Sequence, residues 1–287
     1  MIIEKILKPI WNEFIYGGHL ACLGGTALVF AVSILLNIKI TWEFLVMVYL
    51  LLEVILLFNY YKEIDRDVLT NPERANYHKQ HLKFLPFLIF FYGIGFLILM
   101  ICFGNFKSIT MGIFLIFLGI LFTLTFKKIT KKITGFKTFY VSLCFGLLVF
   151  FTAIYYSFPL NSVVLLIFLF VFLRLSVNTS FFDIKDIESD RREGLRTFPI
   201  IFGKDNFLNY LHIVNLLSFT PIIFGVITKT LPFFSLFLLF LFFYSLYYIK
   251  KAKNKNTNIR TLSYTLVDGE YFFWPIILLL GKFLMGV

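Results

Sequence analysis

The sequence predicts an all-α membrane protein, a bundle of about nine transmembrane helices in a single domain over residues 1–287. Three observations lead to this fold class. Hydrophobic residues make up 59% of the chain and charged residues 15%, whereas soluble domains carry about 25% charge. Apolar segments of about 17–25 residues, long enough to cross a bilayer as helices, recur along the chain. Basic residues are concentrated in alternate connections between these segments.

The apolar segments define nine expected spans. They lie near 17–38, 41–61, 84–103, 108–126, 138–157, 162–182, 207–228, 232–249 and 268–285. Short connections, with Lys39, Lys107 and Lys229 as their basic residues, follow the first, third and seventh spans. Longer basic stretches follow the second, fourth, sixth and eighth spans, at 62–83, 127–137, 185–204 and 250–260.

The basic residues also predict the orientation of the chain. Of the 27 Lys and Arg residues, 22 lie before the first span or in the four long stretches. Because cytoplasmic loops carry an excess of Lys and Arg, we expect the N-terminus and these loops in the cytoplasm. An odd number of spans then places the C-terminus on the opposite side of the membrane.

The net charge of +11 is not the mark of a nucleic-acid-binding protein here. The charge is spread over loops between spans, and no basic domain is present in the sequence. A topological signal together with attraction to anionic lipid explains it better. We therefore expect a lipid bilayer as partner and no nucleic acid.

Three aspartates, Asp183, Asp186 and Asp190, follow the sixth expected span. At roughly 100° per residue, positions i, i+3 and i+7 of a helix fall within an arc of about 60°. Carboxylates crowded on one face repel one another unless a cation lies between them. Mg²⁺ is usually held by such carboxylates together with substrate phosphates.

A similar cluster begins at the end of the second expected span. Asn59, Glu63 and Asp67 are spaced four residues apart and share one helix face, while Asp65 lies roughly opposite Glu63. Both clusters fall at the same expected membrane surface. Together they predict a magnesium-dependent site for a lipid diphosphate, in a cavity shared by two similar halves of the bundle.

The cluster of Asp183, Asp186 and Asp190, with the residues after it, resembles the second aspartate-rich motif of the UbiA family of intramembrane prenyltransferases. The matching residues are Asp183, Asp186, Asp190, Arg191, Gly194, Thr197, Pro199 and Gly203. The family's first motif, Asn-Asp-x-x-Asp-x-x-x-Asp, is matched by Asn59, Glu63 and Asp67, and residues 123–137 resemble the basic loop after the fourth span. Span count and motif positions agree, so the resemblance covers nearly the whole chain.

The resemblance implies a helical bundle whose central cavity opens to the cytoplasmic side and the bilayer. It implies transfer of a prenyl group from a polyprenyl diphosphate to an aromatic or other lipophilic acceptor. Magnesium ions would neutralise the charge that builds on the leaving diphosphate. Asp183, Asp186 and Asp190 would bind one ion, and Asn59, Glu63 and Asp67 another.

Polar residues near the motifs extend the expected site. Arg174 and Asn178 lie inside the sixth span, where a charged residue is costly and usually faces the bundle interior or a watery cavity. We expect both to line the site, with Arg174 and Lys127 the first candidates for diphosphate contacts. Lys127 is equally well explained as a topological charge. Asp268 and Glu270 either stabilise a helix N-terminus or border the site.

Three residues depart from the family pattern. Tyr60 stands where the first motif has its first Asp, Glu63 replaces its second Asp, and Thr123 stands where many members carry Tyr. Glu63 is still a competent magnesium ligand, but Tyr60 cannot replace a carboxylate. One alternative function is transfer of another diphosphate-activated group, such as phosphoribosyl, to a polyprenyl phosphate. Another is a non-enzymatic transporter or scaffold that retains the fold. The intact second motif argues against the latter, and the acceptor is left open.

Overall fold

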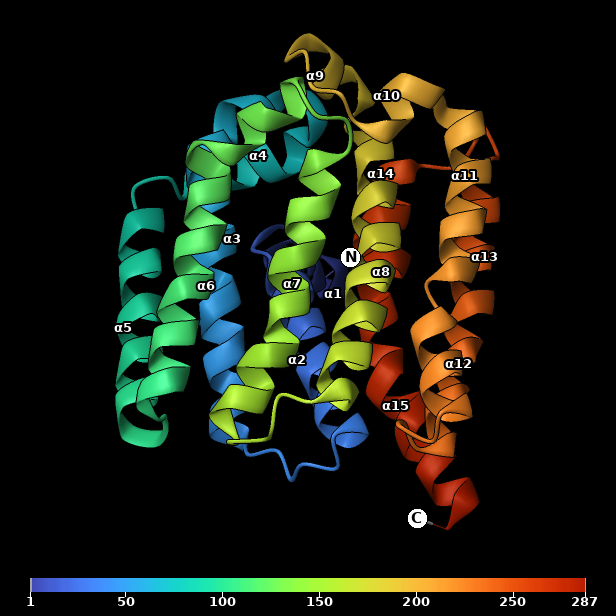
Figure 1. Ribbon diagram of the computed structural model, residues 1–287. Coiled ribbons are helices and arrows are strands. Elements are labelled where there is room, and N and C mark those ends of the chain that lie inside the picture. Colours follow the sequence, from blue (N-terminus) through green and yellow to red (C-terminus); the bar gives the residue numbers. More distant parts are fainter. Residues whose placement is uncertain (1, 287) are drawn as a thin grey trace.

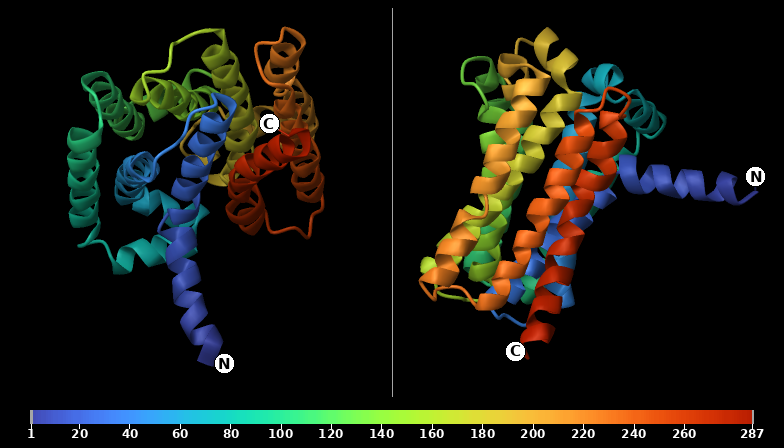
Figure 2. Two further views of the ribbon diagram at one scale, coloured as in Figure 1. Left: turned by 90° about the horizontal axis from the view of Figure 1, so that it is seen from below. Right: turned by 90° about the vertical axis from the view of Figure 1, so that its right-hand side faces the viewer.

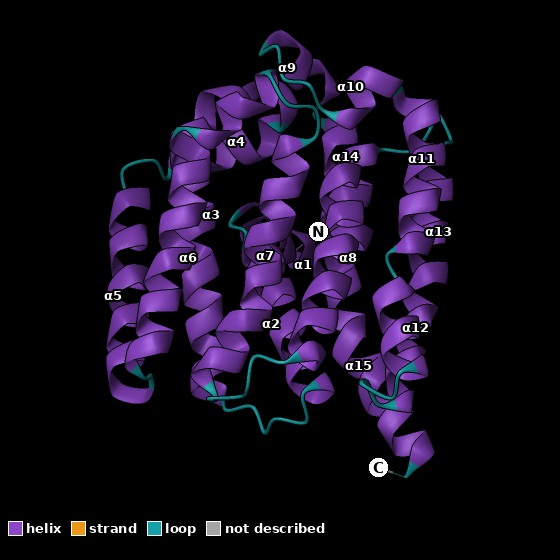
Figure 3. Ribbon diagram, in the orientation of Figure 1, coloured by secondary structure: helices purple, strands orange, loops and turns teal. Residues whose placement is uncertain are grey.

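The computed structural model describes residues 2–286, which form an all-helical bundle with no strand in that range (Figures 1 and 3). The helices of the first half are α1 (Ile2–Tyr16), α2 (His19–Leu35), α3 (Trp42–Thr70), α4 (Pro72–Gln80), α5 (Leu85–Phe103), α6 (Phe106–Leu124), η1 (Phe126–Lys131) and α7 (Phe136–Tyr155). Those of the second half are α8 (Ser162–Lys185), α9 (Ile187–Arg192), α10 (Phe198–Phe202), α11 (Lys204–Leu217), α12 (Thr220–Ile227), η2 (Phe233–Leu239), α13 (Phe240–Ala252), α14 (Ile259–Leu262), η3 (Ser263–Val267) and α15 (Asp268–Met285). The expected fold class is confirmed.

Within the described part of the chain, seven segments are long and apolar enough to cross a membrane. They are Trp42–Val68, Leu85–Phe103, Phe106–Leu124, Phe136–Tyr155, Ser162–Lys185, Lys204–Ile227 and Phe233–Ala252. Lys8–Tyr16 of α1 and His19–Leu35 of α2 meet the same length and hydropathy limits only when taken together, and a bend of 59° separates them; counted as one broken span, they make an eighth. The last expected span corresponds to α15, which carries Asp268, Glu270 and Lys282 within 18 residues. The expected number of nine is therefore approximate.

The bend before α2 follows from two glycines. Gly18 has a φ of +95°, in the left-handed region that L side chains rarely adopt. A Cβ on Gly17 would lie 2.4 Å from the carbonyl oxygen of Glu13. The chain therefore turns here, and α1 projects sideways from the bundle instead of continuing α2 (Figure 2).

The core of the bundle is apolar and closely packed. Helix α7 packs against α8, α2 against α15, and α3 against α5. Small residues allow close approach: a Cβ on Gly119 of α6 would meet Ile55 of α3 at 2.6 Å. Large apolar side chains such as Phe87, Phe106 and Phe283 remain exposed on the outside, as expected for a surface that faces lipid.

One end of the bundle collects the polar connections. Helices α4, α9, α10 and α14 lie at this end, and the C-terminus lies at the opposite end (Figure 1). The four basic stretches expected on one membrane side thus lie at one end of the molecule. Both acidic motifs are found there, the first on the last three turns of α3 and the second at the junction of α8 and α9.

We predict that this end faces the cytoplasm. Single cysteines introduced at exposed Lys79, Lys132, Arg192 and Lys255, in a variant without the three native cysteines, should be labelled by a membrane-impermeant maleimide only from the cytoplasmic side. A cysteine at exposed Phe106, at the other end, is the control and should react only from outside. Labelling of positions 79 and 192 from opposite sides would contradict a site shared by the two motifs.

Candidate active site

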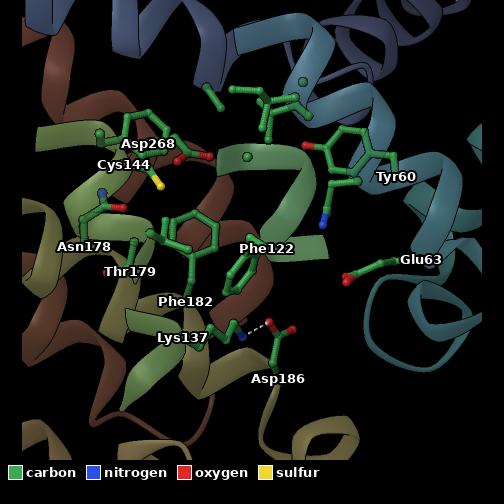
Figure 4. Close-up of a pocket in the computed structure, with 18 of the residues that line it drawn as sticks. Tyr60, Glu63, Phe122, Lys137, Cys144, Asn178, Thr179, Phe182, Asp186 and Asp268 are labelled. Atoms are coloured by element: carbon green, nitrogen blue, oxygen red, sulfur yellow. Dashed lines mark hydrogen bonds and ion pairs between the residues drawn. The ribbon is translucent and has the colours of Figure 1, made fainter. Parts of the chain in front are cut away.

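A cavity of about 310 Å³ lies among α2, α3, α6, α7, α8 and the start of α15. Its polar part holds the end of α3, Lys127, the first turn of α7 and the end of α8. Figure 4 shows Glu63, Lys137 and Asp186 in this part. Deeper in the bundle its wall is apolar, with Leu28, Ile55, Phe145 and Leu175. The cavity thus joins a charged end, where the acidic motifs meet, to an apolar interior.

The first motif lies on one continuous helix, as the spacing predicts. Asn59, Glu63 and Asp67 all line the cavity, whereas Asp65 is exposed on another face of α3. The Asn59 amide donates a hydrogen bond of 3.1 Å to Thr123 Oγ1. Glu63 forms a close ion pair with Lys127, so this predicted site lysine reaches the motif from η1.

The second motif differs from the expected single helix. Helix α8 ends at Lys185, Asp186 separates it from α9, and Asp190 lies within α9. Asp186 stands at the N-cap of α9, but its side chain makes no capping hydrogen bond, because its oxygens are paired with Lys185 and Lys137. The break still leaves the three aspartates together, since Lys137 Nζ lies 2.7 Å from Asp183, 3.5 Å from Asp186 and 3.5 Å from Asp190.

Basic side chains connect the two motifs. Arg66 of α3 forms ion pairs with Glu63 at 3.3 Å and with Glu193 at 2.5 Å, and it contacts Asp190 of the second motif closely. Arg74 of α4 donates two hydrogen bonds to Asp67, of 2.9 and 2.8 Å. Every carboxylate of the two motifs therefore has a cationic neighbour from another part of the chain or the next helical turn.

Sequence reasoning did not name Arg66, Arg74 and Lys137 as site residues. The signal for Arg66 was present, because it lies three residues after Glu63 and so on the same side of the helix. Lys137 begins α7 in the stretch that resembles the family's basic loop. Its contacts with the aspartates are long-range and could not be read from spacing.

The donor atoms suit a hard divalent cation, although not in their present pairing. Asp183 Oδ1 and Asp190 Oδ2 are buried without a hydrogen bond, and Lys137 is the cation beside both. Among the residues described, no three Asp, Glu, His or Cys side chains converge closely enough to hold a metal ion. The carboxylate and amide oxygens fit Mg²⁺ if substrate phosphates supply further ligands and the basic side chains turn toward those phosphates.

The charge state of Asp186 agrees with such a role. Burial alone would raise the pKa of this carboxyl, but the ammonium groups of Lys185 and Lys137 hold its pKa well below the usual range. Lys185 Nζ lies 2.9 Å from Asp186. Asp186 therefore stays ionised at any physiological pH.

Tyr60 lines the cavity beside the first motif but has the surroundings of a packing residue. Its side chain is 7% exposed, and the Arg74 guanidinium lies 4.5 Å from the centre of its ring. The edge of the Tyr60 ring also packs against Gly18: a Cβ added to Gly18 would lie 3.2 Å from Cε2 of the ring. The ring thus helps to place Arg74, the partner of Asp67.

The structure separates Arg174 from Asn178. Asn178 lines the cavity, and its amide donates a hydrogen bond of 2.9 Å to the carbonyl oxygen of Val267. Arg174 does not line the cavity: it is 1% exposed, pairs closely with Glu270, and donates to Asn215 at 2.5 Å and Ser245 at 2.6 Å. The geometry therefore gives Arg174 a role in joining helices, not the expected contact with diphosphate.

Comparison with known proteins identifies the fold. A UbiA homologue from Aeropyrum pernix K1, solved without ligand, superposes with a TM-score of 0.69 at 17% identity, covering 94% of this chain and 98% of that one. A UbiA homologue from Archaeoglobus fulgidus bound to GPP and Mg²⁺ gives a TM-score of 0.65 at 12% identity, covering 93% and 99%. A structure of digeranylgeranylglyceryl phosphate synthase gives 0.59 at 17% identity, covering 95% and 96%.

Sequence comparison identifies the family. No sequence among curated proteins matches this chain. The profile of the UbiA prenyltransferase family, however, matches residues 20–276, which is most of the chain and includes both acidic motifs. The chain therefore belongs to the UbiA prenyltransferase family.

Proposed function

We propose that this protein transfers a prenyl group from a polyprenyl diphosphate to a lipophilic acceptor within the membrane, with Mg²⁺ as cofactor. One observation carries the proposal: two acidic motifs from distant parts of the chain meet, with basic side chains between them, at the polar end of a cavity with an apolar interior. A diphosphate fits the polar end and a hydrocarbon chain the apolar one. Solved homologues bound to GPP or DMAPP with Mg²⁺ support the assignment.

Different residues of the chain would bind the magnesium ions, bind the diphosphate and exclude water. Asp183, Asp186 and Asp190 would hold one magnesium ion, and Asn59, Glu63 and Asp67 the other. The ions would offset the charge on the diphosphate as the bond to the prenyl carbon breaks. Lys127, Lys137 and Arg66, released from their carboxylate partners, would bind the diphosphate oxygens directly. Apolar and aromatic walls would keep water from the reacting carbon.

A transfer assay tests the proposal. Purified protein in lipid nanodiscs is mixed with labelled geranyl or longer prenyl diphosphates and a membrane-lipid extract, with Mg²⁺ or with EDTA. The expected result is a labelled lipophilic product that forms only with Mg²⁺. Failure of every prenyl diphosphate to bind or to react would favour a different diphosphate-activated donor or a non-enzymatic role.

The neutral residue at position 60 gives a prediction about the metal. The first motif supplies only Glu63 and Asp67 as carboxylates, so its Mg²⁺ affinity without substrate should be weak. Tyr60→Asp should raise that affinity, by adding a carboxylate and by drawing Arg74 away from Asp67. Tyr60→Phe, which keeps the ring over Arg74, should leave it unchanged.

Calorimetric titration of Mg²⁺ into the detergent-solubilised variants measures this. A loss of prenyl transfer in Tyr60→Phe with unchanged metal binding would show instead that the hydroxyl contacts a substrate.

A further inference from the structure

Asp268 is a cavity carboxylate that the proposed diphosphate site does not use. Four other cavity carboxylates, Glu63, Asp67, Asp183 and Asp186, are each paired with a lysine or arginine. Asp268 also lines the cavity, yet it makes no hydrogen bond or ion pair with any residue that the structure describes. Figure 4 shows it well apart from Glu63 and Asp186, toward Asn178 and Cys144.

A second polar group on the same helix face is also without a partner. Tyr271 follows Asp268 by three residues, so both side chains project from one side of α15. Tyr271 lines the cavity and is 7% exposed, and its hydroxyl has no hydrogen-bond partner within the described chain. A buried hydroxyl left unpaired costs free energy, and a ligand in the cavity would remove that cost.

The depth of Asp268 matches that of the reacting carbon. The amide of Asn178 donates a hydrogen bond to the carbonyl oxygen of Val267. Asn178 lies five residues before Asp183 on α8, which places it about 7.5 Å deeper along the helix. Asp268 follows Val267 directly and so lies just below the magnesium-binding end. A prenyl diphosphate bound by the two motifs would place its first carbon between the diphosphate and the apolar interior, at this level.

The backbone on both sides of Asp268 is fixed. The preceding turn, η3, is a π-helical turn, a feature often found at functional sites. Tyr244 donates a hydrogen bond of 2.8 Å to the carbonyl oxygen of Leu266, and Asn178 binds the next carbonyl. On the other side, Glu270 is paired with buried Arg174. The position of Asp268 is thus set before any ligand binds.

The charges around the cavity restrict what can bind beside Asp268. Its basic residues, Arg66, Arg74, Lys127, Lys137 and Lys185, are all engaged with the acidic motifs. Lys185 and Arg74 act on Asp268 electrostatically, but neither forms an ion pair with it. A substrate that bears a carboxylate would therefore be repelled by Asp268, with no free cation of the described chain nearby to offset its charge. A neutral hydroxyl group could instead donate a hydrogen bond to Asp268 and accept one from Tyr271.

We infer that Asp268 is a catalytic residue that receives the proton of a neutral hydroxyl acceptor, with the Tyr271 hydroxyl holding the same group. The inference rests on the proposed function. In this step the acceptor's O–H proton passes to the Asp268 carboxylate. The released electron pair forms the new bond to the first prenyl carbon, at the oxygen or, in a phenol, at a conjugated ring carbon. In the second case that ring carbon then loses its own proton, which leaves with the diphosphate, and the oxygen takes back the proton from Asp268, so that the ring is aromatic again. The bond from that carbon to the diphosphate breaks, and its electron pair leaves with the diphosphate.

Matched acceptors and variants test this inference in nanodiscs with geranyl diphosphate and Mg²⁺. Decanol and para-hexylphenol are compared with decanoate and para-hexylbenzoate by measuring labelled product. We expect transfer to a hydroxyl compound and none to the carboxylates. Asp268→Asn, which keeps the size of the side chain, should lower transfer about 100-fold or more. Tyr271→Phe should raise the KM for the hydroxyl compound about fivefold, the effect of one neutral hydrogen bond.

Exposed Asp205→Asn and Tyr247→Phe are the matched controls and should behave as the wild type. Geranyl diphosphate binding, measured without acceptor, should be the same in all these proteins. The inference is overturned if Asp268→Asn transfers normally, if carboxylates are preferred, or if neither hydroxyl compound reacts while geranyl diphosphate still binds. Absence of magnesium-dependent geranyl diphosphate binding in the wild type would instead reject the proposed function itself.

Discussion

Asp183→Asn is expected to abolish prenyl transfer, with a loss of at least about 1,000-fold. Asp183 is 1% exposed and contacts Lys137 at 2.7 Å, and its other oxygen accepts a hydrogen bond of 3.0 Å from Thr138. The amide removes one negative charge from a partly dry site that must hold both Mg²⁺ and a diphosphate. Preorganised charges of this kind contribute factors of about 100–1,000 each, and here binding of the cofactor is lost as well.

The measurement is product formation per minute at saturating geranyl diphosphate, alongside the thermal unfolding midpoint of each variant. Asp65→Asn is the control, because Asp65 is exposed and lies off the cavity face of α3. An Asp65→Asn variant as inactive as Asp183→Asn would show that the helix face assigned to the first motif is incorrect.

Arg174→Ala is expected to destabilise the bundle by about 3–5 kcal/mol, because it leaves a buried Glu270 carboxylate without its cation. Arg174 joins α8 to α11, α13 and α15 through Asn215, Ser245 and Glu270. The double variant Arg174→Met with Glu270→Gln should recover much of the stability, since it removes both charges. Thermal unfolding in detergent measures the effect, and exposed Arg192→Ala is the control.

The same variant separates two roles for Arg174. If Arg174→Ala unfolds as the wild type does but loses affinity for geranyl diphosphate, then the residue contacts substrate, contrary to the position that the structure gives it. A lower unfolding midpoint, with geranyl diphosphate binding retained by the double variant, supports the structural role.

The sequence predicted the helices well because lipid imposes length and composition on each span. The prediction for the first motif also held in its geometry: α3 is continuous through Asp67, so steps of four residues stay on one face and Asp65 points elsewhere. The last span was harder to define, because Asp268, Glu270 and Lys282 interrupt its apolar character. Asp268 and Glu270 face the interior of the bundle, and hydropathy does not show which residues such charges contact.

Contacts between distant segments were beyond sequence reasoning. The break at Asp186 depends on a local choice between continuing a helix and starting another, and spacing alone favours the continuous helix. Arg174 is a charge within a span, and such a residue either lines a cavity or pairs inside the protein. Its pairing with Glu270, 96 positions later, decides between these outcomes, and only the folded chain reveals it.

The central claim is that both motifs bind one prenyl diphosphate through Mg²⁺. Its most direct test is equilibrium binding of geranyl diphosphate to the protein in nanodiscs, with Mg²⁺ or with EDTA, for the wild type, Glu63→Gln, Asp183→Asn and Asp65→Asn. We expect that binding of geranyl diphosphate requires Mg²⁺. Glu63→Gln and Asp183→Asn should each weaken it at least about tenfold, and Asp65→Asn should leave it unchanged. Binding of equal strength in EDTA, or binding that is insensitive to substitution in one of the two motifs, would contradict the account.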